Sequence, residues 1–421
     1  MPVKESTLKQ LYGAEEKELQ RQKKRYQRLE DKYTQYFKNN KPVHIFSTPG
    51  RTEIGGNHTD HNNGRVLAGS INLDSIAMAA VSNNKTATLY SEGYKEPFIV
   101  DLNDLSVIEK EKGTTQALIR GVAARLLQLG YKAEGFNALI SSEVLPGSGL
   151  SSSASIEVLI GTIFNSLFNE SKISPEILAK SGQYAENVFF GKPCGLMDQM
   201  ACAVGGIILI DFKNPDSPMT EQINFDFDKQ NYSLLVVNTK GNHEDLTDDY
   251  AAIPGEMKAV AAEFGKSVCR EISMKELLPK INILRDKHGD RAVLRAYHFI
   301  RENERVQEQA AALKENNFKK FLNLVTESGD SSFKWLQNIF TVNNVKEQRV
   351  SLALALSDYY IKQIGEGACR VHGGGFAGTI QVFLPKKSVD GYRKLIEPVF
   401  GDDSIYILNI RKQGSVDIST L

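Results

Sequence analysis

Residues 146–155 read PGSGLSSSAS, and residues 156–168 continue as IEVLIGTIFNSLF. Apolar residues recur at helical spacing in the second stretch, which predicts a buried helix directly after a loop of glycines and serines. The first N–H groups of a helix have no intrahelical partners and carry partial positive charge, which suits phosphate. Gly147 and Gly149 would let the backbone approach a ligand closely. The stretch is not a Walker sequence, so on spacing alone phosphate binding and an ordinary capped turn both stay open.

The composition is that of a globular protein with more than one domain. A chain of 421 residues exceeds one ordinary core, so two domains are expected. Hydrophobic residues make up 41% and charged residues 24%, and 51 basic residues balance 51 acidic ones. No global field favours nucleic acid or an anionic membrane, and any anion site must be local. Without an apolar leader, an 18-residue apolar run or a CxxC pair, we expect a cytoplasmic protein.

Short strands and helices are mixed along the chain without strict alternation, which favours an α+β fold over a doubly wound sheet. Strands are predicted at 43–48, 75–82, 87–92, 136–142, 205–212, 233–239, 378–385 and 404–410. Helices are predicted at 120–130, 156–168, 175–190, 292–315 and 350–364. Residues 7–38 predict one or two helices whose charges form an exposed face. A polar stretch with two prolines, 212–222, suggests domains at 1–213 and 214–421.

Three further stretches carry polar or flexible residues in unusual density. Residues 48–72 crowd donors, acceptors and a cation between strand-like segments, which indicates either a surface loop or a site for a polyhydroxylated substrate. Residues 191–206 contain Asp198, which, considered by itself, is interpreted as a helix cap in preference to a catalytic acid or base. The glycines of 373–375 precede a strand and indicate a tight turn or a close backbone approach.

Together and in this order, these stretches resemble the motifs of the galactokinases within the GHMP kinase family. The family's GRVNLIGEHTDYNGG resembles GRTEIGGNHTDHNNG here, and its PxGxGLSSSAS resembles PGSGLSSSAS. CGLMDQ matches a further family segment, GGGFAG resembles the family's GGGFGG, and RAYHFIRENERV resembles a helix of its second half. The resemblance spans about residue 40 to residue 390, which makes the family assignment specific.

The resemblance implies the two-domain GHMP kinase fold, with the active site between the domains, and the transfer of phosphate from ATP to the C1 hydroxyl of galactose. It makes Asp198 and Arg51 catalytic and gives Mg²⁺ as cofactor, held by Ser153 and Glu186. Sugar-binding positions fall on Asn57, His58, Asp60, Gly195 and Tyr250. Positions that bind the ATP phosphates fall on Gly147, Ser148, Gly149, Leu150, Ser151, Ser152, Ser153 and Ala154. The implied partners are the sugar and ATP, with no nucleic acid and no membrane.

Three departures from the family pattern leave alternatives open. Asn57 stands where galactokinases usually have glutamate, so galacturonate and then N-acetylgalactosamine are alternative substrates after galactose. Thr115–Leu118 replaces an aromatic segment associated with adenine binding, and residues 253–257, IPGEM, replace paired arginines. A non-catalytic sugar sensor is a remote alternative, because family sensors lack the Ser-Ala pair present here as Ser153 and Ala154.

Overall fold

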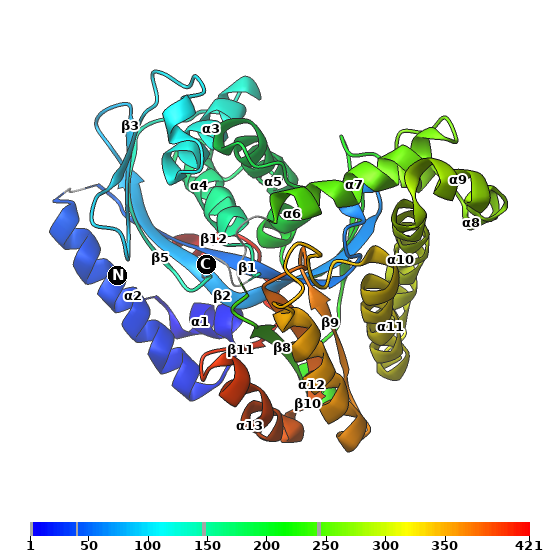
Figure 1. Ribbon diagram of the computed structural model, residues 1–421. Coiled ribbons are helices and arrows are strands. Elements are labelled where there is room, and N and C mark those ends of the chain that lie inside the picture. The colour runs from blue at the N-terminus through cyan, green and yellow to red at the C-terminus, as the bar shows by residue number, and fades with distance from the viewer. Residues whose placement is uncertain (1–2, 39–40, 145–148, 242–245) are drawn as a thin grey trace.

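The computed structural model describes residues 3–38, 41–144, 149–241 and 246–421 as two sheets surrounded by helices (Figure 1). The larger sheet has the order β12-β1-β2-β5-β3-β4, and β6 pairs with β2 and with β7. Its strands are β1 (His44–Gly55), β2 (Arg65–Val81), β3 (Thr86–Ser91), β4 (Phe98–Asp101), β5 (Phe136–Ser142), β6 (Ile207–Asp211), β7 (Met219–Ile223) and β12 (Val416–Asp417). The smaller sheet has the order β11-β8-β10-β9, with β8 (Tyr232–Asn238), β9 (Ala368–His372), β10 (Thr379–Pro385) and β11 (Ile405–Leu408). The mixture of helices and largely antiparallel sheets confirms the α+β prediction.

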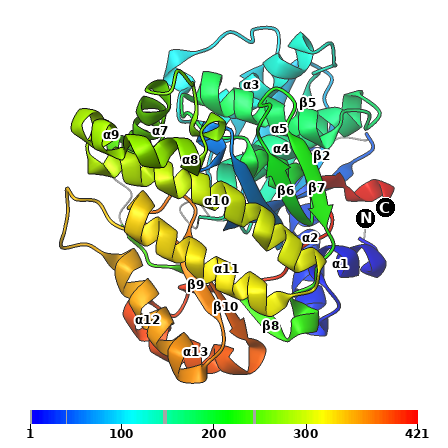
Figure 2. The same cartoon turned by 90° about the vertical axis from the view of Figure 1, so that its right-hand side faces the viewer.

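The helices cover both faces of each sheet (Figures 1 and 2). They are α1 (Glu5–Tyr12), α2 (Glu16–Tyr36), α3 (Thr115–Gln128), α4 (Ser152–Phe168), α5 (Pro175–Tyr184), α6 (Met197–Val204), α7 (Thr247–Ala262), α8 (Met274–Leu277), α9 (Ile281–His288), α10 (Asp290–Lys314), α11 (Phe318–Ser331), α12 (Arg349–Ile364) and α13 (Val389–Phe400). Figure 2 shows α10 and α11 lying side by side across one side of the molecule. Among the described residues, no helix combines the length and apolar character needed to cross a membrane.

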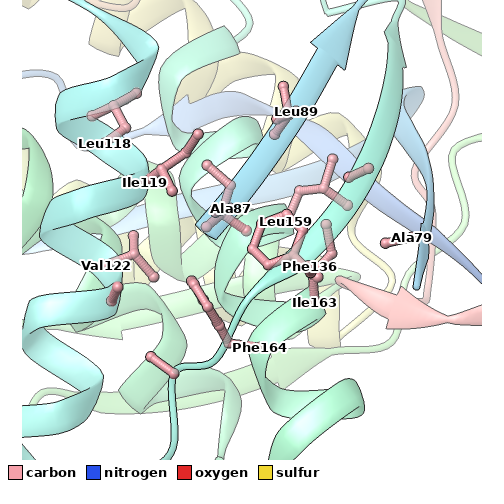
Figure 3. Packing of buried hydrophobic residues seen from close by; sticks show 14 of the residues in the cluster. Ala79, Ala87, Leu89, Leu118, Ile119, Val122, Phe136, Leu159, Ile163 and Phe164 are labelled. Carbon is pink, nitrogen blue, oxygen red and sulfur yellow. The ribbon is translucent and has the colours of Figure 1, made fainter. Parts of the chain in front are cut away.

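The central strands β1, β2 and β5 of the larger sheet are largely buried, because their side chains point alternately to two faces and helices pack against both. Ala77 and Ala79 of β2 pack with α3 and α4, whereas Ile76 and Met78 pack with α1 and α2. Figure 3 shows the first of these cores, in which Phe136 of β5 lies against side chains of α4. This packing anchors α4 to the centre of the sheet.

The structure decides one alternative that the sequence left open and contradicts one expectation. Residues 48–72 are not a surface loop, because β1 continues to Gly55 and β2 begins at Arg65, and both strands are largely buried. The charges of 7–38 do not all lie on an exposed face, because Arg25 is 7% exposed and pairs with the fully buried Asp74. Sequence patterns missed both features because the partners that make burial tolerable are distant in the chain.

The predicted boundary at 213/214 is not tested and stays a prediction. The larger sheet does include strands from both sides of it, since β7 pairs with β6 and β12 pairs with β1. Gly205 and Gly414 are in close contact where the C-terminal segment returns, because a Cβ on Gly205 would lie 2.3 Å from the backbone nitrogen of Gly414.

Candidate active site

Arg51 and Asp198 form a two-point ion pair between β1 and α6. Arg51 lies in β1 beside a register irregularity between Pro49 and Arg51, and such irregularities redirect side chains. Its Nε and one terminal nitrogen donate to the two oxygens of Asp198, each at 2.7 Å. The Arg51 side chain is 7% exposed, whereas that of Asp198 is 32% exposed. The carboxylate is therefore fixed in orientation and still accessible to a substrate hydroxyl.

The Asp198 carboxylate also contacts the start of α4. The Ser151 hydroxyl donates to Asp198 Oδ2 instead of capping its own helix. Burial raises the pKa of Asp198, but the Arg51 guanidinium and the Ser151 hydroxyl outweigh it, so the pKa lies below the usual aspartate value. The contacts of Asp198 are thus those of an ionised carboxylate paired with Arg51, and the helix-cap interpretation does not describe them.

The loop before α4 is held by backbone contacts with β1. The Arg51 N–H donates to the Leu150 carbonyl at 3.1 Å, and the Arg51 guanidinium donates to the Gly149 carbonyl. Gly149 has φ +71°, and a Cβ there would lie 2.3 Å from Thr379 Oγ1 in β10. Leu150 and Ala154 are buried, and Ser152 and Ser153 are half-buried in the first turn of α4. The predicted loop residues Gly147 and Ser148 lie outside the described residues.

The two predicted metal ligands lie next to each other. Ser153 Oγ donates to Glu186 Oε1 at 3.1 Å. Glu186 does not lie on the regular helix α5 but in the π-helical segment Ala185–Phe190 that follows it. Such a segment shifts the register of side chains and often occurs at functional sites. It brings Glu186 to α4 although the two residues lie 33 positions apart in the chain.

A hydroxyl and a carboxylate fit Mg²⁺, which binds one or two protein oxygens and completes its octahedron with water and phosphate oxygens. The described residues contain no group of three or more His, Cys, Asp or Glu side chains arranged for a metal. A metal at Ser153 and Glu186 would therefore depend on the nucleotide for further ligands. The Lys192 ammonium lies 3.4 Å from Glu186 Oε1, which marks this oxygen as a site for positive charge.

Sequence reasoning missed the residues that support Glu186. The side-chain amide of Gln199 donates to Glu186 Oε2 and to Glu157 Oε2, both at 3.0 Å. Burial and the carboxylate of Glu186 raise the pKa of Glu157 well above its usual value. One signal was available, because Glu157 lies four residues after Ser153 in a helix predicted to be buried. Lys192 and Gln199 gave no comparable signal.

Two of the predicted sugar-binding residues form hydrogen bonds with the glycines of residues 373–375. His58 Nε2 donates to the Gly374 carbonyl at 2.8 Å, and the Tyr250 hydroxyl donates to the Gly375 carbonyl at 3.0 Å. Burial and the nearby His61 lower the pKa of His58 to about 3, so this imidazole is neutral near pH 7. Tyr250 also lies close to Gly374, where a Cβ would be 2.5 Å from its ring.

Asp60 and Gly195 are also in contact. A Cβ on Gly195 would lie 1.9 Å from Asp60 Oδ2, so only glycine leaves room for this carboxylate. Asp60 lies in a short 3₁₀ helix, Asp60–Asn62, and Gly195 lies just before α6. The first motif and the CGLMDQ segment are therefore adjacent, as a shared substrate site requires.

Asn57 lies deeper than the other predicted sugar-binding residues. It is fully buried, and its amide bonds with Glu53, Gly373, Ser332 and Asn338. Its assignment to substrate binding is untested and stays a prediction. Thr115–Leu118 forms the first turn of α3, with Leu118 in the core, and residues 253–257 lie within α7 around Pro254.

Comparisons with known proteins find similarity to galactokinases and to other GHMP kinases. The family description "GHMP kinases N terminal domain" matches residues 117–206, and "Galactokinase galactose-binding signature" matches residues 31–81. The galactokinase of Clostridium tetani is 30% identical over 359 residues, which are 83% of this chain and 86% of that protein.

Solved structures extend the likeness to the whole fold. The galactokinase of Lactococcus lactis, crystallised with galactose, has a TM-score of 0.81 at 25% identity and covers 93% of this chain and 99% of its own. The mevalonate kinase of Methanococcus jannaschii has a TM-score of 0.61 at 18% identity, covering 88% of this chain and 99% of its own. The second likeness concerns the fold alone.

Proposed function

The chain belongs to the galactokinase family of GHMP kinases, and on that premise we propose that it transfers a phosphoryl group from ATP to the C1 hydroxyl of galactose. The products are galactose 1-phosphate and ADP. The observation that carries the proposal is the Arg51–Asp198 ion pair beside the N-terminus of α4. In this arrangement the oriented carboxylate of Asp198 lies next to the N-terminus of α4, which is suited to bind phosphate.

Asp198 orients the C1 hydroxyl and accepts its proton. Its lowered pKa makes it a weak base, so the proton moves late, when the bond to phosphorus is already forming. Arg51 keeps both carboxylate oxygens in place and adds positive charge beside the transferred group. The two residues act as one unit, because removing either leaves the other without its charge partner.

The N-terminus of α4 holds the ATP phosphates. The Ser151 hydroxyl accepts no N–H of its own helix, so backbone N–H groups of the first turn are available to phosphate oxygens. Ser153 and Glu186 would hold Mg²⁺, which neutralises phosphate charge when bound. Gln199 keeps the Glu186 carboxylate turned toward Ser153.

On the sugar side, Asp60, His58 and Tyr250 supply an acceptor, an imidazole and a hydroxyl within one region. Gly195 leaves the space that Asp60 occupies. The buried, fully bonded amide of Asn57 offers no reason to prefer galacturonate to galactose. The Arg51–Asp198 pair and Ser153 favour an enzyme over a non-catalytic sensor. A cytoplasmic location, with the sugar and ATP as partners, is part of this proposal.

A coupled assay of ADP release tests the proposal with galactose, galacturonate and N-acetylgalactosamine, each with Mg-ATP. We expect the highest kcat/KM with galactose, and phosphorus NMR should show the phosphate on C1. ATP turnover that does not depend on any of the three sugars would refute a sugar kinase. A higher kcat/KM with galacturonate would refute the choice of galactose while leaving the phosphoryl transfer intact.

A further inference from the structure

The amide of Asn57 has no hydrogen-bonding capacity left for a sugar. An asparagine side chain can donate twice and accept twice. Nδ2 donates to Glu53 Oε1 at 3.0 Å and to the Gly373 carbonyl at 2.7 Å. Oδ1 accepts from Asn338 Nδ2 at 2.8 Å and from Ser332 Oγ at 3.2 Å. A direct contact with substrate would require one of these four bonds to break.

Asn338 holds the same glycine cluster from the other side. Besides Asn57, its Nδ2 donates to the Gly374 carbonyl at 3.1 Å. The backbone carbonyl of Asn338 accepts the N–H of Phe376, and a Cβ on Gly375 would lie 2.0 Å from that backbone oxygen. The loop of residues 373–375, called here the glycine loop, is therefore bonded to Asn57 and to Asn338 at successive residues.

The glycine loop in turn fixes two side chains of the proposed sugar site. Its Gly374 carbonyl accepts from His58, and its Gly375 carbonyl accepts from Tyr250. A change in the position of these carbonyls would therefore move both side chains. Asn57 and Asn338 can control the sugar site in this way without touching the sugar.

The segment around Asn338 borders a cavity. Its neighbours Gln337, Ile339 and Phe340 line a cavity of about 330 Å³ that Phe376 and residues of α7 and α10 also border. Hydrogen bonds to Asn57 and to the glycine loop add to what holds this segment in place, and because the side chains of Asn57 and Asn338 are fully buried, the loss of these bonds is costly.

We propose that Asn57 and Asn338 are a pair of positioning residues that set the glycine loop, and through it His58 and Tyr250, for sugar binding. The inference rests on the proposed function, because it is measured by galactose phosphorylation. It replaces a direct role of Asn57 in substrate contact by an indirect one.

The first test compares steady-state kinetics of the wild type, Asn57→Asp and Asn338→Asp. Each change keeps the size of the side chain and removes its donors. Losing a buried hydrogen bond corresponds to about a tenfold change in affinity, so we expect KM for galactose to rise about tenfold or more. KM for Mg-ATP should stay within about twofold. Ser332→Ala removes one donor to Asn57 and should raise KM for galactose by a smaller factor. This variant provides the test if the aspartate variants do not fold.

Asn317→Ala is the matched control, because Asn317 caps α11 by accepting the Lys320 N–H and lies outside the network. It should lower the Tm and leave KM for galactose unchanged. If the network variants likewise lost Tm without any change in KM for galactose, their role would be structural only and the inference would be overturned.

The second test separates positioning from direct contact with 2-, 3-, 4- and 6-deoxygalactose as substrates. If Asn57 acts only through the glycine loop, Asn57→Asp and Asn338→Asp should lower kcat/KM with the same pattern across galactose and the deoxy sugars, because both act on the same loop. If Asn57 itself binds one hydroxyl, the loss caused by Asn57→Asp should disappear for the sugar that lacks that hydroxyl while the loss caused by Asn338→Asp remains, and the inference would be wrong. If the wild type does not phosphorylate galactose, the proposed function and the inference are both refuted. If the wild type is active, the variants test the inference alone.

Discussion

Replacing Asp198 by asparagine keeps the shape of the side chain and removes the charge that Arg51 binds. In the wild type both carboxylate oxygens accept from Arg51 at 2.7 Å. Asparagine leaves one acceptor and turns an NH₂ group toward the guanidinium. Breaking a buried ion pair costs about 3–5 kcal/mol, but because Asp198 is 32% exposed, we expect solvent to reduce the loss of stability to about 1–3 kcal/mol.

The effect on catalysis should be larger than the effect on stability. Orientation of the hydroxyl and acceptance of its proton are worth about 10²- to 10⁴-fold, or about 3–5 kcal/mol of barrier. We expect kcat to fall by that factor in the coupled ADP assay. Affinity for Mg-ATP, measured by calorimetry, should stay within about threefold, because the backbone of α4 is unchanged.

Asp211→Asn is the matched control, since Asp211 also pairs with arginines, Arg65 and Arg270, but away from the proposed site. It should cost stability and leave kcat close to that of the wild type. If Asp198→Asn kept kcat within tenfold of the wild type, the charge of Asp198 would not be needed and the proposed mechanism would be refuted.

Three further predictions concern the metal, the loop and the N-terminal helices. Glu186→Gln should raise the Mg²⁺ concentration for half-maximal activity at least severalfold without lowering the Tm, and an unchanged Mg²⁺ titration would make Glu186 structural. Gly149→Ala should raise KM for ATP about tenfold or more, because φ is +71° and the new Cβ would meet Thr379, and unchanged nucleotide kinetics would contradict this. Arg25→Met should lower the free energy of unfolding by about 3 kcal/mol in urea near pH 7, because it takes one of two arginines from the buried Asp74. Burial raises the pKa of Asp74, but Arg25 and Arg411 lower it more, so the pKa lies below the ordinary aspartate value of 3.8. The ion pairs therefore stabilise the fold fully above pH 3.8 and are lost as the pH falls through the lowered pKa. The difference in free energy of unfolding between variant and wild type should narrow in acid.

Local patterns predicted the helices around the site well. The periodic residues after the glycine-serine loop form α4, and Ser174 caps α5 with Pro175 at its first position. These features depend on residues three or four positions apart, which a sequence displays directly. The same patterns could not show that the helix predicted at 175–190 ends at Tyr184 and continues as a π segment. The position of Glu186 depends on that irregularity.

Long-range ion pairs explain why strand β1 was predicted too short. The prediction ended at residue 48, but β1 continues through Arg51 and Glu53 to Gly55. Charged residues rarely fill buried strands unless they are paired. Their partners here are Asp198, 147 positions away, and Arg370, 317 positions away. Only the folded chain brings these charges together, so the resemblance to a family identified the residues while the structure gave their contacts.

The surroundings of Asn57 change what an exchange to glutamate would measure. The sequence suggested that the missing charge at this position alters the choice of sugar. In the structure, Asn57 Nδ2 lies 3.0 Å from Glu53 Oε1, and Glu53 already pairs with the buried Arg370. Glutamate at position 57 would set a second carboxylate beside Glu53 and would remove the donor to Gly373. Its first effect would be on this buried network and the glycine loop. The charge at position 57 can therefore be interpreted as a determinant of sugar preference only in a chain where Glu53 and Asn338 have also changed.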